Sequence, residues 1–177
     1  MRPASLIAAT VVTLTLVAIV AADVPLRPKK AACSGDRGDI ATGNPTNGSM
    51  KAVGELDEPD FGAIVDSPTG VTFRIEGLSL NVGGYQQFPL GTCVSVPSGG
   101  LRCESIVPYY GKAKLKPVRS RPPAVRFTVR QAGVYTIRCA PGPTTVKILY
   151  GPSGAQTVHS ATLSNCTQSG TKTLCTD

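Results

Sequence analysis

The sequence has no tryptophan, only one histidine, and a single long apolar run, which lies at its start. Without tryptophan, a stacking platform for neutral sugars is not favoured. One histidine and no C-x-x-C spacing leave no zinc-ligand set, so we expect no metal and no cofactor. The G-x-S-x-G, H-E-x-x-H, P-loop and G-x-G-x-x-G patterns are also missing, which removes the signatures of several enzyme classes.

The remaining enzymatic candidates are few. His159 lies in the strand-like stretch QTVHSATL, where we interpret it as structural because no nucleophile motif accompanies it. A carboxylate-pair hydrolase stays open as an alternative, since the separation of two carboxylates is a three-dimensional property. Its candidate side chains are Asp57, Glu58, Asp60 and Asp66. The sequence nevertheless favours a protein that is not an enzyme and has no catalytic residue.

The apolar run at the start has the layout of a secretory signal peptide. Arg2 precedes the run from Leu6 to Val20, and small residues follow at Ala21 and Ala22. We predict a signal peptide over residues 1–22, cleaved after Ala22, and an exported, extracellular product. A retained membrane anchor is the alternative, because the run is almost long enough to span a bilayer.

All six cysteines follow this segment, and an even number in an oxidising compartment predicts three disulfides. Six cysteines allow fifteen connectivities, which spacing alone does not separate. The pairing that closes two short loops and leaves one long link is Cys93–Cys103, Cys166–Cys175 and Cys33–Cys139. With every cysteine paired, cysteine catalysis is disfavoured.

Charge is distributed unevenly along the chain. Residues 23–66 hold 5 basic and 8 acidic side chains, whereas residues 67–177 hold 12 basic and 3 acidic ones. No acidic side chain lies between Glu104 and Asp177. Such asymmetry creates a directional surface potential, which concerns partners more than fold.

The order of the segments predicts one domain. Residues 23–32 are short, basic and proline-bearing, and we interpret them as an extended leader to a single domain over residues 33–177. Two sequons, at Asn47 and Asn165, predict a glycoprotein if the protein is made by a eukaryote. The loop-like stretch 34–49 also contains Arg37-Gly38-Asp39, a short integrin-type motif that suggests cell adhesion when exposed.

Alternating apolar and polar residues recur through the domain, with glycine and proline between the runs. Strands are expected at 50–56, at 71–76 and again at 78–82 after a bend at Gly77, in a hairpin over 92–104, at 112–116, at 144–150 and at 156–163, with a closing loop at 166–175. No helical periodicity appears after the signal segment. The pattern therefore predicts an all-β, antiparallel, disulfide-stabilised β-sandwich.

A basic hairpin over residues 125–139 is the clearest structural pattern in the sequence. Gln131-Ala132-Gly133 is interpreted as its turn, which would place Arg126 opposite Arg138. Like charges opposite each other repel unless water, side-chain freedom or an anion relieves them. The run GVYTIRC within it resembles immunoglobulin-type sandwiches, in which a tyrosine precedes a strand cysteine; here Tyr135 precedes Cys139 by four positions rather than two. The resemblance implies an immunoglobulin-like architecture only.

The function that follows is binding or adhesion through a basic surface. The candidate ligand-binding residues are Lys112, Lys114, Lys116, Arg119, Arg121, Arg126, Arg130 and Arg138. Lysine and arginine on a rigid sheet suit an acidic glycan, an anionic membrane surface or an acidic protein, whereas nucleic acid is not expected for an exported protein. A simpler interpretation is that these charges only keep the protein soluble. A small-lipid carrier and a structural protein working through protein contacts are the alternatives.

Overall fold

The computed structural model of the chain describes residues 26–35, 48–57, 63–64, 66–67, 69–79, 84–97, 99–105, 110–120, 124–134 and 137–177. These residues form an all-β, sandwich-like fold of two antiparallel sheets. The predicted signal segment lies outside the described residues. Within them, no helix combines the length and apolar character needed to cross a bilayer.

The larger sheet has eight strands. In spatial order they are β11 (Asn165–Ser169), β12 (Lys172–Thr176), β1 (Leu26–Ser34), β2 (Gly48–Leu56), β8 (Val125–Val134), β7 (Tyr110–Pro117), β6 (Gly100–Ser105) and β5 (Cys93–Val96). The smaller sheet has four strands: β10 (Thr157–Leu163), β9 (Thr144–Tyr150), β3 (Val71–Glu76) and β4 (Gly84–Phe88).

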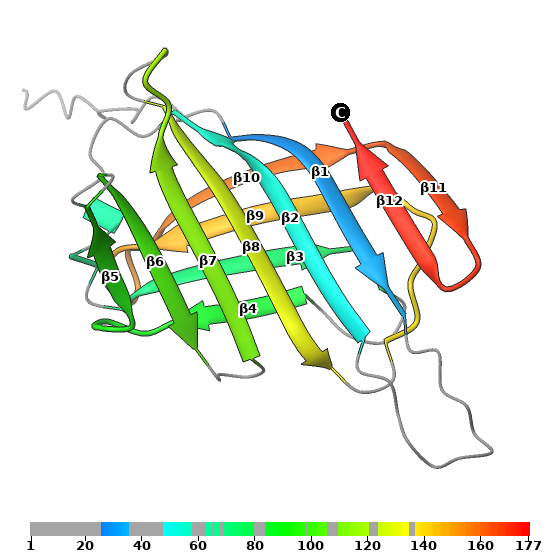
Figure 1. Cartoon of the computed structure of the whole chain (residues 1–177), viewed down its shortest axis with the longest axis horizontal. Helices are drawn as coiled ribbons and strands as arrows, with labels where there is room; N and C mark the ends of the chain where they lie inside the picture. Colours follow the sequence, from blue (N-terminus) through cyan, green and yellow to red (C-terminus); the bar gives the residue numbers. More distant parts are fainter. Residues whose placement is uncertain are drawn as a thin grey trace, which may run out of the picture.

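The two sheets stack face to face, and the strands of the smaller sheet cross those of the larger one at a steep angle (Figure 1). Alternation supplies the core, because every second side chain of a regular strand lies on the same face of its sheet. Phe73 of the smaller sheet lies between Phe88, with ring centroids 5.9 Å apart, and Phe127 of the larger sheet, 6.0 Å away. This packing leaves the opposite face of the larger sheet free to carry charge.

The three disulfides are the three pairs expected from the sequence. Cys33–Cys139 joins β1 to the segment that leaves β8 for the smaller sheet, where Cys139 also forms an isolated bridge with Ser79. It therefore ties the two layers together. Since it links residues 106 positions apart, it constrains the unfolded chain more than a short loop would.

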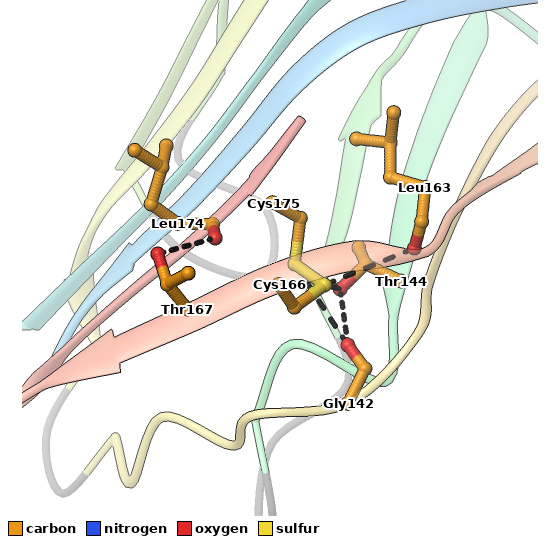
Figure 2. Close-up of a disulfide and its surroundings, with 7 residues drawn as sticks. All are labelled: Gly142, Thr144, Leu163, Cys166, Thr167, Leu174 and Cys175. Atoms are coloured by element: carbon orange, nitrogen blue, oxygen red, sulfur yellow. Dashed lines mark hydrogen bonds between the residues drawn. A yellow bond between two sulfur atoms is a disulfide. The ribbon is translucent and has the colours of Figure 1, made fainter. Parts of the chain in front are cut away.

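The other two disulfides join directly opposed residues at the two edges of the larger sheet. Cys93 faces Cys103 across β5 and β6, and Cys166 faces Cys175 across β11 and β12. Figure 2 shows the second pair, with the Thr144 hydroxyl 3.2 Å from the Cys175 sulfur. The hydroxyl is the donor, because a disulfide sulfur carries no hydrogen. Thr144 is the first residue of β9, so this contact links the disulfide-bonded strands β11 and β12 to the smaller sheet.

The predicted hairpin over residues 125–139 is wrong. Strand β8 continues through the expected turn to Val134 and is paired along both sides, with β2 and with β7. No free edge remains for residues 137–139, which lie outside both sheets apart from the bridge at Ser79. Arg126 faces Glu55 and Lys116 instead of Arg138.

The predicted leader over residues 23–32 is also wrong from Leu26 onward, because these residues form β1 between β2 and β12. A bulge between Pro28 and Lys30 shifts the alternation by one residue, which hides the strand in the sequence. The tail, expected as a loop, is the hairpin of β11 and β12. The first and the last strand of the described residues, β1 and β12, therefore lie side by side in the larger sheet.

The immunoglobulin-like arrangement is not confirmed. Immunoglobulin sheets keep their strand directions within about 30° of each other, whereas the strands here cross steeply (Figure 1). The larger sheet alone also has eight strands, against seven to nine in a whole immunoglobulin domain. Tyr135, on which the resemblance depended, lies outside the described residues.

Gly70 offers a test of the loop before β3. Its φ is +71°, and a Cβ built there would lie 2.0 Å from the carbonyl oxygen of Phe88. Gly70→Ala is expected to lower the free energy of unfolding by about 3 kcal/mol or more, from left-handed strain together with overpacking. Urea denaturation measures the change.

Gly91→Ala is the matched control for this substitution. Gly91 has a φ of +84°, but a Cβ there would meet nothing within 4 Å. Strain alone should cost about 1–2 kcal/mol. Equal costs at both positions would contradict the close approach of Gly70 to Phe88.

Candidate anion-binding face

The outer face of the larger sheet is strongly basic. Strand alternation and register place the same kind of side chain on this face in six neighbouring strands. We call this surface the basic face; its cations are Arg27, Lys30, Lys51, Arg102, Lys112, Lys114, Lys116, Arg126, Arg130 and Lys172. They come from both ends and the middle of the sequence.

Some of these cations form a row across the strands. Lys112 of β7 is directly opposite Arg130 of β8, which is directly opposite Lys51 of β2. A second like-charged pair joins Lys116 and Arg126. Neighbouring strands lie about 4.8 Å apart, and like charges placed opposite each other are destabilising. The row therefore carries an unfavourable repulsion that a bound anion would relieve.

Glu55 is the carboxylate that the basic face encloses. Its side chain is 5% exposed, and its Oε1 accepts hydrogen bonds from Lys29 Nζ at 2.8 Å and Arg126 Nη2 at 3.2 Å. Lys29 is the extra residue of the β1 bulge, so the bulge delivers a cation to this carboxylate. Glu55 thus neutralises charge at one end of the basic face, whereas Arg130 in the row has no ion pair with a carboxylate of the described residues.

Glu104 plays a similar role at the other side of the face. Arg102 Nε lies 3.0 Å and Lys112 Nζ 3.3 Å from its Oε1. Hydrogen bonds from Arg102 and then from Lys112 hold the pKa of Glu104 below its ordinary value. Hydrogen bonding to Tyr110, then to Glu104, raises the pKa of Lys112. Lys112 is therefore charged at any physiological pH.

These shifts give a pH prediction with a definite sign. Because the pKa of Glu104 is lowered in the folded state, its ion pairs stabilise the fold above the unfolded pKa, and this contribution is lost as pH falls through the folded pKa. NMR titration of the Glu104 carboxyl is expected to give a midpoint below 4.5, and Arg102→Gln should raise it. A midpoint at or above 4.5 in the unsubstituted protein would contradict the assigned contacts.

Other cations of the face form no ion pair with a carboxylate of the described residues. They are Lys30, Lys51, Lys114, Lys116, Arg130 and Lys172.

The surface of the basic face has two depressions near these cations. One, of about 350 Å³, is lined by Lys116, Arg119 and Arg126 among others. The other, of about 330 Å³, is lined by Tyr110, Lys112, Arg130 and Ala132.

The structure brings together most of the basic residues singled out in the sequence. Lys112, Lys114, Lys116, Arg126 and Arg130 lie on one face of β7 and β8, and Arg119 follows in the adjoining turn. Arg138 is exposed but lies outside the two sheets, and Arg121 lies outside the described residues. The binding role of all of them remains a prediction.

Sequence reasoning missed the other half of the basic face. Lys30, Lys51 and Lys172 lie far apart in the sequence and meet only through the pairing of β1 with β2 and β12. The local signal at Lys30 was hidden by the bulge. At Lys172 it is hidden because the sequence predicts a loop over residues 166–175, where the structure has the hairpin of β11 and β12.

The other predicted sites give little further chemistry. Asn165 is exposed at the start of β11, whereas Asn47, Arg37-Gly38-Asp39, Glu58 and Asp60 lie outside the described residues. Asp57 Oδ2 forms an ion pair with Arg27 Nη2 at 3.0 Å, and Asp66 is exposed. His159 is buried, with its Nε2 3.0 Å from the Tyr150 hydroxyl.

In the ranges that the structure describes, no three His, Cys, Asp or Glu side chains come together as a potential metal site. No protein-family model, curated protein or solved structure matches the chain. The fold and the basic face together define a class of protein: a disulfide-bonded all-β protein with one strongly basic sheet face.

Glu55 provides a test of how the face is balanced. Glu55→Gln is expected to lower the free energy of unfolding by about 1–3 kcal/mol, because it weakens the hydrogen bonds that a buried carboxylate accepts from two half-exposed cations. The same change should strengthen binding to a sulfated polysaccharide, since Arg126 and Lys29 lose their carboxylate. Denaturation and binding measurements on one sample check both signs.

Glu76→Gln is the control, because Glu76 is paired with Lys147 on the smaller sheet, at 2.6 Å. It makes the same change in net charge away from the basic face. If both variants strengthened binding equally, only net charge would matter and the assigned role of Glu55 would be wrong.

Proposed function

We propose that this protein is an exported binding module whose basic face holds an anionic polymer. The observation that carries the proposal is the row Lys112, Arg130 and Lys51 on three adjacent strands, for which like charges lie directly opposite each other. Export is supported by the three disulfides, which persist in oxidising compartments.

A sheet face suits this role because its side chains are held in fixed register. A ligand that meets a rigid array does not have to order the backbone, which reduces the entropic cost of association. Both edges of the larger sheet are closed by a disulfide, at Cys93–Cys103 and Cys166–Cys175. Arginine adds forked hydrogen bonds to the point charges of the lysines.

An acidic polysaccharide fits the face better than a membrane or an acidic protein. Membrane binding gains much of its strength from apolar side chains that enter the lipid. Among the described residues, the large apolar side chains exposed on this face are single ones on separate strands, such as Val94 and Leu174. A linear polyanion can instead follow the row of cations across the strands.

The experiment is retention of the oxidised protein on a sulfated-polysaccharide column, compared with an ordinary cation exchanger. The test variant is Lys114→Gln/Lys116→Gln/Arg130→Gln, which removes cations without taking a partner from a described carboxylate. The control is Arg74→Gln/Arg138→Gln/Lys147→Gln, which has the same net charge but changes residues off the face.

The proposal expects the unsubstituted protein to elute at higher salt from the polysaccharide than from the exchanger. This difference should disappear in the test variant and persist in the control. Equal elution from both columns would show that the basic residues only keep the protein soluble and bind no specific polysaccharide.

The lipid-carrier alternative calls for a continuous cavity between the sheets. At the level of Phe73, Phe88 and Phe127 the space is filled by their three rings. This packing favours the outer face over the interior as the binding surface.

A further inference from the structure

A third hollow lies on the basic face where β1, β2 and β12 meet. Its volume is about 350 Å³, and the residues that line it include Lys30, Ala32, Lys51, Arg130, Lys172 and Leu174. None of these side chains is acidic. Only Arg130 belongs to the basic stretch that the sequence singled out, so this site arises from long-range strand pairing.

The hollow exists because a small side chain stands among long ones. Ala32 of β1 points outward between Lys30 and Ser34, and it faces Lys51 on one side and Leu174 on the other. A methyl group next to lysines leaves the space above it empty. The floor is therefore short and partly apolar, and its rim is cationic.

The rim combines charges with hydroxyl groups. Lys30, Lys51, Arg130 and Lys172 are exposed and form no ion pair with a described carboxylate. Ser34 and Ser49 are half-buried and directly opposite each other. Hydroxyl groups and flexible ammonium groups around a forked guanidinium are the donors that a tetrahedral oxyanion accepts from.

We propose that this hollow is a subsite for one sulfate or phosphate group that projects from an acidic polysaccharide bound along the basic face. The inference rests on the proposed function and adds to it the place and chemical class of a specific contact. The row Lys112, Arg130 and Lys51 leads directly to the hollow, because Ala32 and Leu174 continue the same register across β1 and β12.

The volume agrees with this assignment. A water molecule takes about 30 Å³ of liquid, so the hollow has room for an oxyanion, part of the sugar that carries it and some water. A carboxylate attached directly to a sugar ring reaches less far than a sulfate ester. We therefore expect sulfated or phosphorylated chains to bind more tightly than chains with carboxylates alone.

The first test fills the hollow without changing any charge. Ala32→Leu places a branched side chain on its floor and keeps every cation. Affinity for a sulfated polysaccharide is expected to fall about tenfold, equivalent to about 1.4 kcal/mol. Ser160→Leu is the control, because Ser160 is exposed on β10 of the smaller sheet, and its affinity should stay within about twofold.

The second test removes charge and needs no added bulk, so it stands if Ala32→Leu does not fold. Lys51→Gln/Lys172→Gln is compared with Lys114→Gln/Lys116→Gln, a pair on the same face outside the hollow, and with Arg74→Gln/Lys147→Gln on the smaller sheet. The hollow pair is expected to lose the most affinity for the sulfated chain. Only that pair should stop discriminating between sulfated and carboxylated polysaccharides.

The outcomes separate the two proposals. Equal losses for the two pairs on the basic face, with Arg74→Gln/Lys147→Gln unaffected, would overturn the subsite and keep the basic face. Equal losses for all three pairs would overturn both. If the protein bound anionic lipid vesicles as tightly as the polysaccharide, the polysaccharide assignment would be overturned. Competition with inorganic sulfate and phosphate shows whether the isolated group is enough to occupy the hollow.

Discussion

Replacing Cys33 and Cys139 together with serine is expected to lower the free energy of unfolding by about 4–5 kcal/mol. The reason is the 106-residue separation, which gives this disulfide the largest effect on the unfolded chain. It also joins β1 to the segment that leaves for the smaller sheet. In urea denaturation the midpoint should move strongly, because this loss is a large share of a typical domain's stability.

The comparison is the Cys93→Ser/Cys103→Ser variant. That bond links residues only 10 positions apart, at the edge of the larger sheet. Its loss should cost about 3 kcal/mol, less than the long link. If the two double variants were equally stable, the long disulfide would not be what holds the layers together.

Neutralising the row of cations is expected to have the largest effect on binding. Lys51→Gln/Lys112→Gln/Arg130→Gln should weaken affinity for a sulfated polysaccharide by about 100-fold at low salt, taking about 1 kcal/mol for each cation near an anionic surface. The plot of log affinity against log salt should also become shallower, because fewer counterions are released. Isothermal titration at several salt concentrations measures both.

Folding stability separates this result from a general loss of structure. The row variant should keep nearly the stability of the unsubstituted protein, because removing like charges that face each other offsets the loss of the Lys112–Glu104 ion pair. A destabilised row variant would show that these side chains support the fold. An unchanged affinity together with an unchanged slope of the salt plot would contradict a contact at the row.

Local patterns predicted the strands well and their partners poorly. The alternation in VTFRIE corresponds to β3. The short hairpin TCVSVPSGGLRCE corresponds to β5 and β6, which could be paired from the sequence because they are neighbours along the chain. The stretch after Val125 also alternates as expected. The residues of this stretch do not by themselves indicate that it pairs with β2 and β7. Gln131-Ala132-Gly133 favours a turn locally, but pairing with both neighbours keeps these residues in strand β8.

The candidate site shows the same limit. Lys112, Lys114 and Lys116 could be placed on one face from alternation alone, as could Arg126 and Arg130. The contribution of Lys30, Lys51 and Lys172 requires knowing that β1 pairs with both β2 and β12. The predicted Arg126–Arg138 repulsion was placed at the wrong pair, and the repulsion occurs where Arg130 faces Lys51 and Lys112.

Binding along the basic face is tested by mapping backbone amide NMR shifts while a sulfated oligosaccharide is titrated into the isotope-labelled protein. We expect shifts in β1, β2, β7, β8 and β12, centred on Arg130 and Ala32, with β3, β4, β9 and β10 unchanged. Shifts that concentrate on the four-stranded sheet, or saturable binding without shifts on the eight-stranded sheet, would contradict it.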